Sequence, residues 1–274
     1  MTRFFISTKH LSEEPYSGII GFPRATTRQT ARRISEMISL GIDAISFIGP
    51  TTIGRLGVLG KGYVGVVVLG KKGRKLVAVK IRRTDSQRNS MRGEAEMLRV
   101  ANAVHVGPKF YSASRNCLVM EYLKGHSIGS WAESLGGRGS AIQVKMVAKK
   151  ILEDCYRLDC ADIDHGELSS MSKHVIIGKS QEIIDFEGAS TKRRASNVTA
   201  ATQAVYIGSG ISKKIRRVCS VPQKDIIIPY LREYKQDNSR KNFEALLKLL
   251  KIPQEEPRYR RITSVPKNGG IGRI

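Results

Sequence analysis

The most constraining feature of this 274-residue chain is a set of three glycines in the pattern G-x-G-x-x-G, at residues 60–65 (GKGYVG). The residues that follow at once, 66–69, read VVVL. A glycine loop that opens a dinucleotide-binding unit is followed by a helix, whereas β-branched residues with a period of two favour a strand. The glycines therefore predict the tip of a β-hairpin, where backbone N–H groups can approach a phosphate closely.

A lysine lies at the end of the next strand, which we expect at residues 75–81. The segment 77–80 reads VAVK, and places Lys80 fifteen residues after Gly65. Most lysines are exposed on the surface, but one directed from this strand toward the glycine hairpin could hold nucleotide phosphates. It would need a carboxylate from the next helix, expected at 85–103. Glu94 and Glu96 cannot share a face, and Glu94 adjoins the apolar positions 95, 98 and 101.

A third segment, residues 183–187 (IIDFE), places Asp185 at the end of an apolar strand. A strand-end aspartate is commonly a turn former, but one followed by phenylalanine can present its carboxylate to Mg²⁺ while the ring packs beneath. The glycine hairpin, Lys80 and Asp185 occur in the order that an ATP site of the protein-kinase kind requires, with HGELS at 165–169 ahead of Asp185. This order predicts binding of ATP with Mg²⁺, or with Mn²⁺ in its place.

Residues 118–122 (LVMEY) are expected to form a strand that runs into the connection between two lobes. Backbone groups of Glu121 and Tyr122 would pair with adenine there. An ordinary core strand is equally compatible with these five residues.

Three motifs carry a family resemblance: HGELS at 165–169, IDFEGAS at 184–190 and SNVT at 196–199. They resemble the atypical archaeal Ser/Thr protein kinases of the protein-kinase-like superfamily, which are related to the RIO kinases and to the minimal kinase of the KEOPS complex. The resemblance covers roughly residues 50–210. It implies an α+β, bilobal protein-kinase-like fold with a β-rich N-lobe and a mainly helical C-lobe. It also implies Mg-ATP as cofactor and phosphoryl transfer to Ser/Thr hydroxyls of a protein substrate.

The chain departs from the family pattern at three positions. Glu167 occupies the position of the catalytic base, where aspartate is usual; its carboxylate can still accept a hydroxyl proton. The metal-binding asparagine is replaced by Ser172 if residues are counted from the base, or by His174 if the alignment follows the strand at 175–177. Neither is a typical Mg²⁺ ligand. Glu187 replaces the glycine of D-F-G and could serve a second metal ion.

The candidate site residues form three groups by role. They are Glu167, Lys80 and Asp185 for catalysis; Gly60, Gly62, Gly65, Lys80, Glu94, Glu121 and Tyr122 for the nucleotide; and Asp185, Ser172, His174 and Glu187 for metal.

The expected organisation is an accessory segment with one helix at 1–50, the N-lobe at 51–123, the C-lobe at 124–265 and a disordered tail at 266–274. We expect a strand at 53–59, a long helix capped by Ser140, a hairpin around Gly178, and further helices at 197–207, 223–234 and 240–251.

The net charge of +23 is unusual, and after residue 187 there are nineteen basic and six acidic residues. Such an excess favours a polyanionic partner, and RNA or a ribosomal particle is the natural candidate. The clusters at 192–194, 213–217 and 258–261 could line a groove or merely coat a helical lobe. No apolar run is long enough to span a bilayer, and the four cysteines show no zinc spacing, so we expect a cytoplasmic protein without membrane contact.

Three functions follow from these observations. The first is an atypical Ser/Thr kinase, or a RIO-like ATPase that acts on an RNA particle. The second is a catalytically weakened kinase-fold scaffold that binds RNA or the ribosome. The third is a small-molecule phosphotransferase, which the basic C-terminal third disfavours when the acceptor is a cation. The sequence leaves the acceptor and the oligomeric state open.

Overall fold

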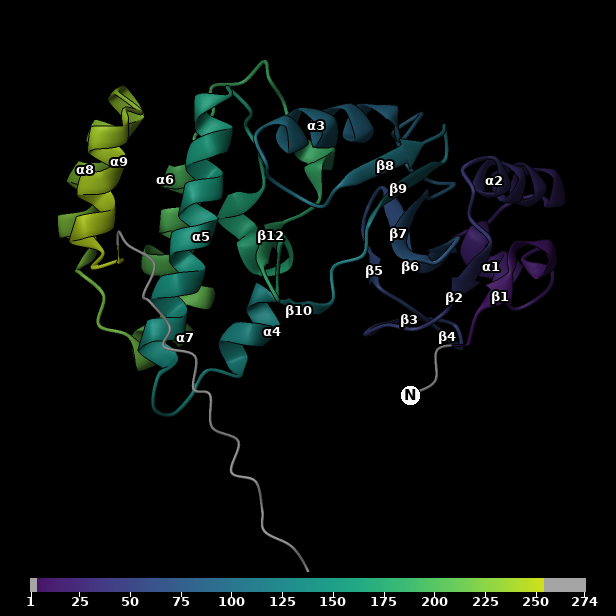
Figure 1. Ribbon diagram of the computed structural model, residues 1–274, viewed down its shortest axis with the longest axis horizontal. Coiled ribbons are helices and arrows are strands. Elements are labelled where there is room, and N and C mark those ends of the chain that lie inside the picture. The colour runs from purple at the N-terminus through teal and green to yellow at the C-terminus, as the bar shows by residue number, and fades with distance from the viewer. Residues whose placement is uncertain (1–3, 254–274) are drawn as a thin grey trace, which may run out of the picture.

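A computed structural model describes residues 4–253 and confirms an α+β, bilobal fold. The N-terminal lobe is built on an antiparallel sheet and the C-terminal lobe is mainly helical, as Figure 1 shows. The expected tail at 266–274 and the basic cluster at 258–261 lie outside the described residues.

The main sheet has the strand order β1-β2-β6-β7-β9-β8, with β5 paired to the other end of β6. Its strands are β1 (Ile6–Ser7), β2 (Ala44–Ser46), β5 (Gly60–Lys61), β6 (Gly65–Lys72), β7 (Lys75–Arg82), β8 (Phe110–Ala113) and β9 (Cys117–Glu121). The β6–β7 hairpin places Val67 opposite Lys80. Lys80 thus extends from the strand next to the glycine turn.

The strand expected at 53–59 is not continuous. The structure has β3 (Thr51–Ile53) and β4 (Leu56–Val58), which pair with each other around a turn. Gly54 supplies that turn with a φ of +59°, a conformation in the left-handed region that favours glycine.

The helix expected at 85–103 begins later, as α3 (Arg92–Ala103). Ser86 and Ser90 account for the difference. The Ser86 hydroxyl accepts a hydrogen bond from the backbone N–H of Arg88, and the Ser90 hydroxyl accepts one from Arg92. Local bonds of this kind compete with helical ones, so residues 83–91 form a loop.

The N-terminal segment is more than one accessory helix. It contains α1 (Tyr16–Ile20) and α2 (Thr27–Ser39), and β1 and β2 extend the main sheet through pairing of Ile45 with Gly70. Thr26 and Gln29 form the capping box at the start of α2. Glu36 ties α2 to the sheet: its carboxylate accepts hydrogen bonds from Ser114 Oγ (2.6 Å) and from Asn116 N and Nδ2 (2.8 and 2.7 Å).

The C-lobe surrounds one long helix, α5 (Ser140–Cys160), whose buried face includes Val144, Ile151 and Leu158. Ser140 is its first residue; Gly139 is the N-cap, with a φ of +94°. The other helices are α4 (Ile128–Glu133), α6 (Asn197–Thr202) with a π-turn at Gln203–Ile207, α7 (Ile211–Val218), α8 (Lys224–Gln236) and α9 (Arg240–Leu249). Of these, α4 and α7 were not expected from the sequence.

A small sheet lies where the two lobes meet. It consists of β10 (Gly125–Ser127), β11 (Val175–Gly178) and β12 (Gln181–Ile183), and the expected hairpin around Gly178 is its β11–β12 pair. The chain passes from β9 to β10 through residues 122–124, which link the lobes (Figure 1). None of the helices between residues 4 and 253 has the length and apolar character needed to cross a bilayer.

Candidate active site

Lys80 lies at the centre of a cluster of three carboxylates from two parts of the chain, α3 and the segment after β12. Its Nζ donates to Glu94 Oε1 at 2.8 Å, to Asp185 Oδ1 at 2.7 Å and to Glu187 Oε2 at 2.8 Å. Its side chain is 4% exposed. Burial disfavours the charged ammonium, but the three carboxylates outweigh burial and raise the pKa of Lys80 above its usual value.

The glycine turn leaves room for this lysine. A Cβ on Gly65 would lie 2.9 Å from Lys80 Cγ and 3.0 Å from the Ile81 carbonyl oxygen, so only glycine fits where the lysine side chain crosses the strand. The turn is tight, with Gly62 N donating to Gly65 O at 2.9 Å.

The first two glycines face open space. Among the described residues, a Cβ on Gly60 would meet no atom within 4 Å, and one on Gly62 would meet the Gly65 oxygen at 3.8 Å. Tyr63, at the tip, is 91% exposed. The fold thus requires glycine at 65 but not at 60 or 62, where a closely approaching ligand would give glycine a purpose.

Glu94 rather than Glu96 contacts Lys80, as the helical spacing predicted. Glu94 is buried on α3 while Glu96 is exposed. Burial raises the pKa of Glu94 to about 7, although Lys80 acts in the opposite direction. Its second oxygen, Oε2, is buried and has no hydrogen-bond partner within residues 4–253.

Asp185 follows β12 in the left-handed region, with φ +71° and ψ +70°. Phe186 is buried beneath it and contacts the edge of the His165 ring, with centroids 5.1 Å apart. His165 Nε2 in turn lies 3.0 Å from the Ile184 carbonyl oxygen. Burial opposes ionisation of Asp185, but Lys80 outweighs it and lowers the pKa of the carboxyl.

Glu167, His174 and Asp185 bring a ligand atom each to within 4.8 Å of one another, and so do Glu94, Asp185 and Glu187. In the described part of the chain, Glu167 Oε2 and His174 Nδ1 are buried without a hydrogen-bond partner. Burial also raises the pKa of Glu167. The first group combines two carboxylates with an imidazole, and such a set can hold a divalent cation.

Ser172, the other residue considered for this position, is exposed in the short 3₁₀ segment Leu168–Lys173. A Cβ on Gly129 of α4 would lie 3.3 Å from the Ser172 Cβ, so Ser172 packs against α4. The fold thus places His174 beside Glu167 and Asp185, and a role of either residue in metal binding stays a prediction.

Glu121 and Tyr122 lie at the lobe connection as expected. Glu121 is the last residue of β9, and pairs with Val77 of β7. Its carboxylate accepts a hydrogen bond from Lys109 N at 3.2 Å. A contact between their backbone and adenine stays a prediction.

A buried polar network that the sequence did not reveal supports the segment before Glu167. Asp159 of α5 accepts hydrogen bonds from Asn197 N (2.7 Å), Asn197 Nδ2 (2.8 Å), Val198 N (3.1 Å) and Tyr234 Oη (3.0 Å). Asn197 also accepts from His165 N at 2.9 Å and donates to the Ile163 carbonyl at 2.6 Å. Residues 163–165 are thereby tied to α5 and α6.

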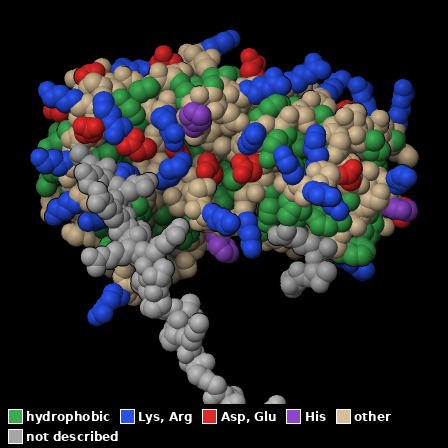
Figure 2. Space-filling view, in the orientation of Figure 1, with side chains coloured by type: hydrophobic (Ala, Val, Ile, Leu, Met, Phe, Trp, Pro, Cys, Tyr) green, Lys and Arg blue, Asp and Glu red, His purple; other side chains and the backbone are tan. Residues whose placement is uncertain are grey.

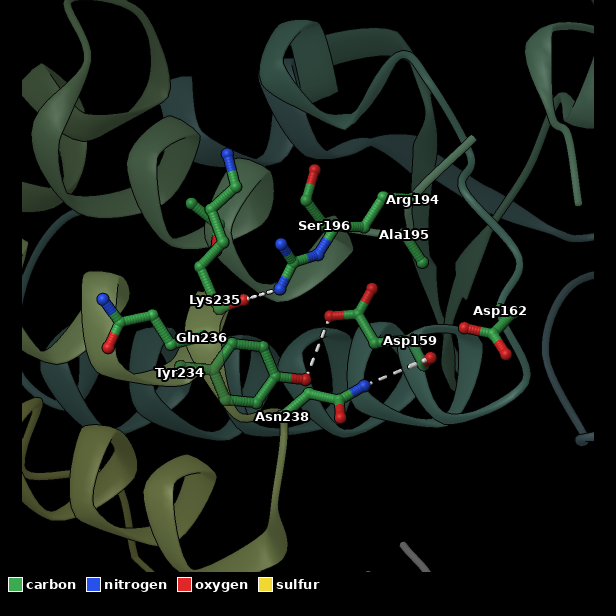
Figure 3. Close-up of a pocket in the computed structure, with 10 residues that line it drawn as sticks. Asp159, Asp162, Arg194, Ala195, Ser196, Tyr234, Lys235, Gln236 and Asn238 are labelled. Atoms are coloured by element: carbon green, nitrogen blue, oxygen red, sulfur yellow. Dashed lines mark hydrogen bonds between the residues drawn. The ribbon is translucent and has the colours of Figure 1, made fainter. Parts of the chain in front are cut away.

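Figure 3 shows Asp159 with Tyr234 and Asn238 at the wall of a cavity of about 190 Å³. This cavity lies within the C-lobe and its lining includes neither Lys80 nor Asp185. Burial raises the pKa of Asp159, against the effect of its hydrogen-bond donors. We interpret Asp159, at the wall of this cavity, as structural, because it holds the Asn197 side chain that is bonded to residues 163 and 165.

Several side chains of the basic clusters make internal contacts. Arg193 donates to Asp164 and to the Gly188 carbonyl, and Arg194 donates to the Lys235 carbonyl. On α7, Lys214 pairs with Glu133 at 2.6 Å, and Arg216 donates to two carbonyls at the end of the π-turn. Figure 2 shows lysine and arginine spread over both lobes on the visible face.

No family model matches the chain. The chain is similar to the uncharacterized protein MJ1211 of Methanocaldococcus jannaschii, with 27% identity over 115 residues, which is 42% of this chain and 94% of that protein. This similarity assigns no activity to the chain.

Proposed function

We propose that this chain is an ATP-dependent phosphotransferase of the atypical Ser/Thr protein-kinase kind, which transfers a phosphoryl group to protein hydroxyls. The observation that carries the proposal is the cluster at Lys80. A strand lysine, a helix carboxylate and a strand-end aspartate meet at 2.7–2.8 Å beside a glycine hairpin with open space above it. These are the parts that hold and orient the phosphates of ATP in kinases.

Each part has a role in this proposal. The backbone at Gly60 and Gly62, where no Cβ obstructs the approach, covers the phosphates, and the Lys80 ammonium binds the α- and β-phosphates. Glu94 holds Lys80 in place from the side away from the nucleotide. The backbone of Glu121 and Tyr122 pairs with adenine.

Asp185, Glu167 and His174 would hold one divalent cation, Mg²⁺ or Mn²⁺, and Glu187 would serve a second. Within residues 4–253, Glu167 Oε2 is buried and accepts no hydrogen bond, which fits this role, since a buried anionic oxygen without a donor is costly unless a cation satisfies it. When bound, the cation neutralises charge on the phosphates.

Glu167 is the proposed general base. The substrate hydroxyl oxygen forms a bond to the γ-phosphorus while the bond from that phosphorus to its bridging oxygen breaks. ADP leaves with the electron pair, and the hydroxyl proton passes to Glu167.

The proposed substrate is a protein, and the proposed setting is an RNA or ribosomal particle in the cytoplasm. The net charge of +23 supports a polyanionic partner. One observation favours a weakened scaffold as a second candidate. The Lys80 ammonium, which would have to bind the phosphates of ATP, already donates a hydrogen bond to the Glu187 carboxylate.

The test is incubation with γ-labelled ATP and Mg²⁺ or Mn²⁺, with and without ribosomal subunits. We expect label on serine or threonine, or release of phosphate, and loss of both in Lys80→Ala and Asp185→Ala. Lys75→Ala, on the same strand, and Asp225→Ala, on α8, are matched controls that should keep activity. Activity that persists in Asp185→Ala would contradict the role of Asp185 as a metal ligand. A lack of ATP turnover under all conditions would support the alternative of a catalytically weakened scaffold.

The RNA proposal has its own measurement. Affinity for ribosomal RNA should fall steeply between about 50 and 200 mM salt, because phosphate contacts release counterions. An affinity insensitive to ionic strength would exclude this mechanism.

A further inference from the structure

We propose that His174 makes the metal site prefer Mn²⁺ over Mg²⁺. This inference deepens the proposed function and rests on it, because it takes the cleft as a metal–nucleotide site. It concerns the position where the family pattern has asparagine and this chain has an imidazole.

The imidazole lies within reach of both carboxylates of the site. His174 Nε2 is 3.6 Å from Glu167 Oε2, and a ligand atom of each lies within 4.8 Å of one on Asp185. The His174 side chain is 16% exposed, and its Nδ1 is buried without a partner in residues 4–253. The nitrogen that faces Glu167 is Nε2, so this nitrogen is the one that a cation between the two carboxylates could reach.

Backbone hydrogen bonds on both sides fix the position of His174. Its N–H donates to the Met171 carbonyl at 2.9 Å, and its own carbonyl accepts from Ile184 N at 2.9 Å. Ile184 directly precedes Asp185, so the histidine, just before β11, and the aspartate, just after β12, are held next to the ends of two paired strands. The ring also lies 5.9 Å from the ring of His165.

This ligand set discriminates between the two cations. Mg²⁺ demands near-ideal octahedral oxygen coordination and binds imidazole poorly. Mn²⁺ also suits carboxylate and phosphate oxygens, but it accepts imidazole nitrogen more readily. Two carboxylates and one imidazole, completed by phosphate oxygens, therefore favour Mn²⁺.

The experiment measures binding and needs no turnover. Mn²⁺ and Mg²⁺ are titrated against the full chain, alone and with the β,γ-methylene analogue of ATP, for wild type, His174→Asn and the control His126→Asn. His126 is an exposed residue of β10. We expect wild type and His126→Asn to bind Mn²⁺ at least about tenfold more tightly than Mg²⁺, and His174→Asn to lose most of that ratio. An unchanged ratio in His174→Asn would overturn the inference.

Electron spin-echo envelope modulation of bound Mn²⁺ gives a direct readout. Wild type should show ¹⁴N coupling from an imidazole, which His174→Asn should lose and His126→Asn should keep. Absence of this coupling in wild type would overturn the inference even if the His174→Asn variant failed to fold. Coupling without ATP turnover would refute the proposed function but support the metal site. ATP turnover without coupling would support the proposed function but refute the role of His174 as a metal ligand.

Discussion

Lys80 Nζ lies 2.8 Å from Oε2 of Glu187, the residue that stands where the related pattern has glycine. Together with Glu94 and Asp185, Glu187 surrounds one ammonium with three carboxylates. A phosphate that binds Lys80 must therefore displace a carboxylate or approach with a cation. If the site binds a nucleotide as we propose, its affinity should therefore depend strongly on the metal.

Replacing Glu187 should weaken that dependence. In Glu187→Gln we expect metal-free ATP to bind about tenfold more tightly, because one negative charge leaves a partly buried site. Titration calorimetry with EDTA, compared with Mg²⁺ or Mn²⁺, measures the change. Glu182→Gln, on β12, is the control. An equal response of the two variants would show that Glu187 does not compete with phosphate.

Glu94 should matter to catalysis where Glu96 does not. Both residues are on α3, but only Glu94 contacts Lys80, which it positions. We expect kcat/KM for ATP turnover to fall about 10- to 100-fold in Glu94→Gln, because a small displacement of a catalytic group is costly, and to stay unchanged in Glu96→Gln. A circular dichroism melt of both variants confirms folding. Equal kcat/KM values for Glu94→Gln and Glu96→Gln would show that Glu94 has no role in the active site.

Asp159 should be essential for stability. It accepts four hydrogen bonds in a buried setting, and an amide in its place would direct a donor at donors. We expect Asp159→Asn to lower the free energy of unfolding by about 2–4 kcal/mol and Tyr234→Phe by about 1 kcal/mol. Asp162→Asn, at an exposed position, should stay within about 0.5 kcal/mol of wild type. Urea unfolding that ranks the variants otherwise would contradict the network.

Glu36 should make the attachment of α2 sensitive to acid. Burial opposes ionisation, but hydrogen bonds from Ser114 and Asn116, with the charge of Arg32, lower the pKa of Glu36 below its ordinary 4.5. Above 4.5 the carboxylate is ionised in both the folded and the unfolded chain, and the full stabilisation is present. As the pH falls below 4.5, the unfolded chain takes up the proton first, so stability is lost until the folded carboxyl also protonates.

The variant Glu36→Gln tests the direction in which stability changes with pH. We expect it to be less stable than wild type by about 1–2 kcal/mol at pH 7, and the difference to shrink as the pH falls below 4.5. Denaturant unfolding at several pH values measures both. A difference that grew in acid would contradict the lowered pKa.

Local patterns predicted much of the site. The β-branched run after the glycines indicated a hairpin, and the apolar spacing on the following helix favoured Glu94 over Glu96, which agrees with the contact to Lys80. Such signals depend on residues a few positions apart. They can therefore be recognised in the sequence without knowledge of the fold.

Other features depend on distant parts of the chain. Strands β1 and β2 are two and three residues long, too short for a readable period, and only pairing with β6 makes them part of the sheet. The sequence could not distinguish Ser172 from His174, because the short 3₁₀ segment Leu168–Lys173 determines how many residues separate Glu167 from the next strand. Asp159 and Asn197 are 38 residues apart and meet only when α5 and α6 pack together.

The most direct test of the central claim is calorimetric binding of ATP with Mg²⁺ or Mn²⁺ to wild type, Lys80→Met and Lys75→Met. Lys75 lies on the same strand as Lys80 but is exposed. The account predicts binding by wild type and Lys75→Met, and loss of at least about 10-fold in affinity in Lys80→Met. Equal binding by all three proteins, or binding by none, would contradict a nucleotide site at Lys80.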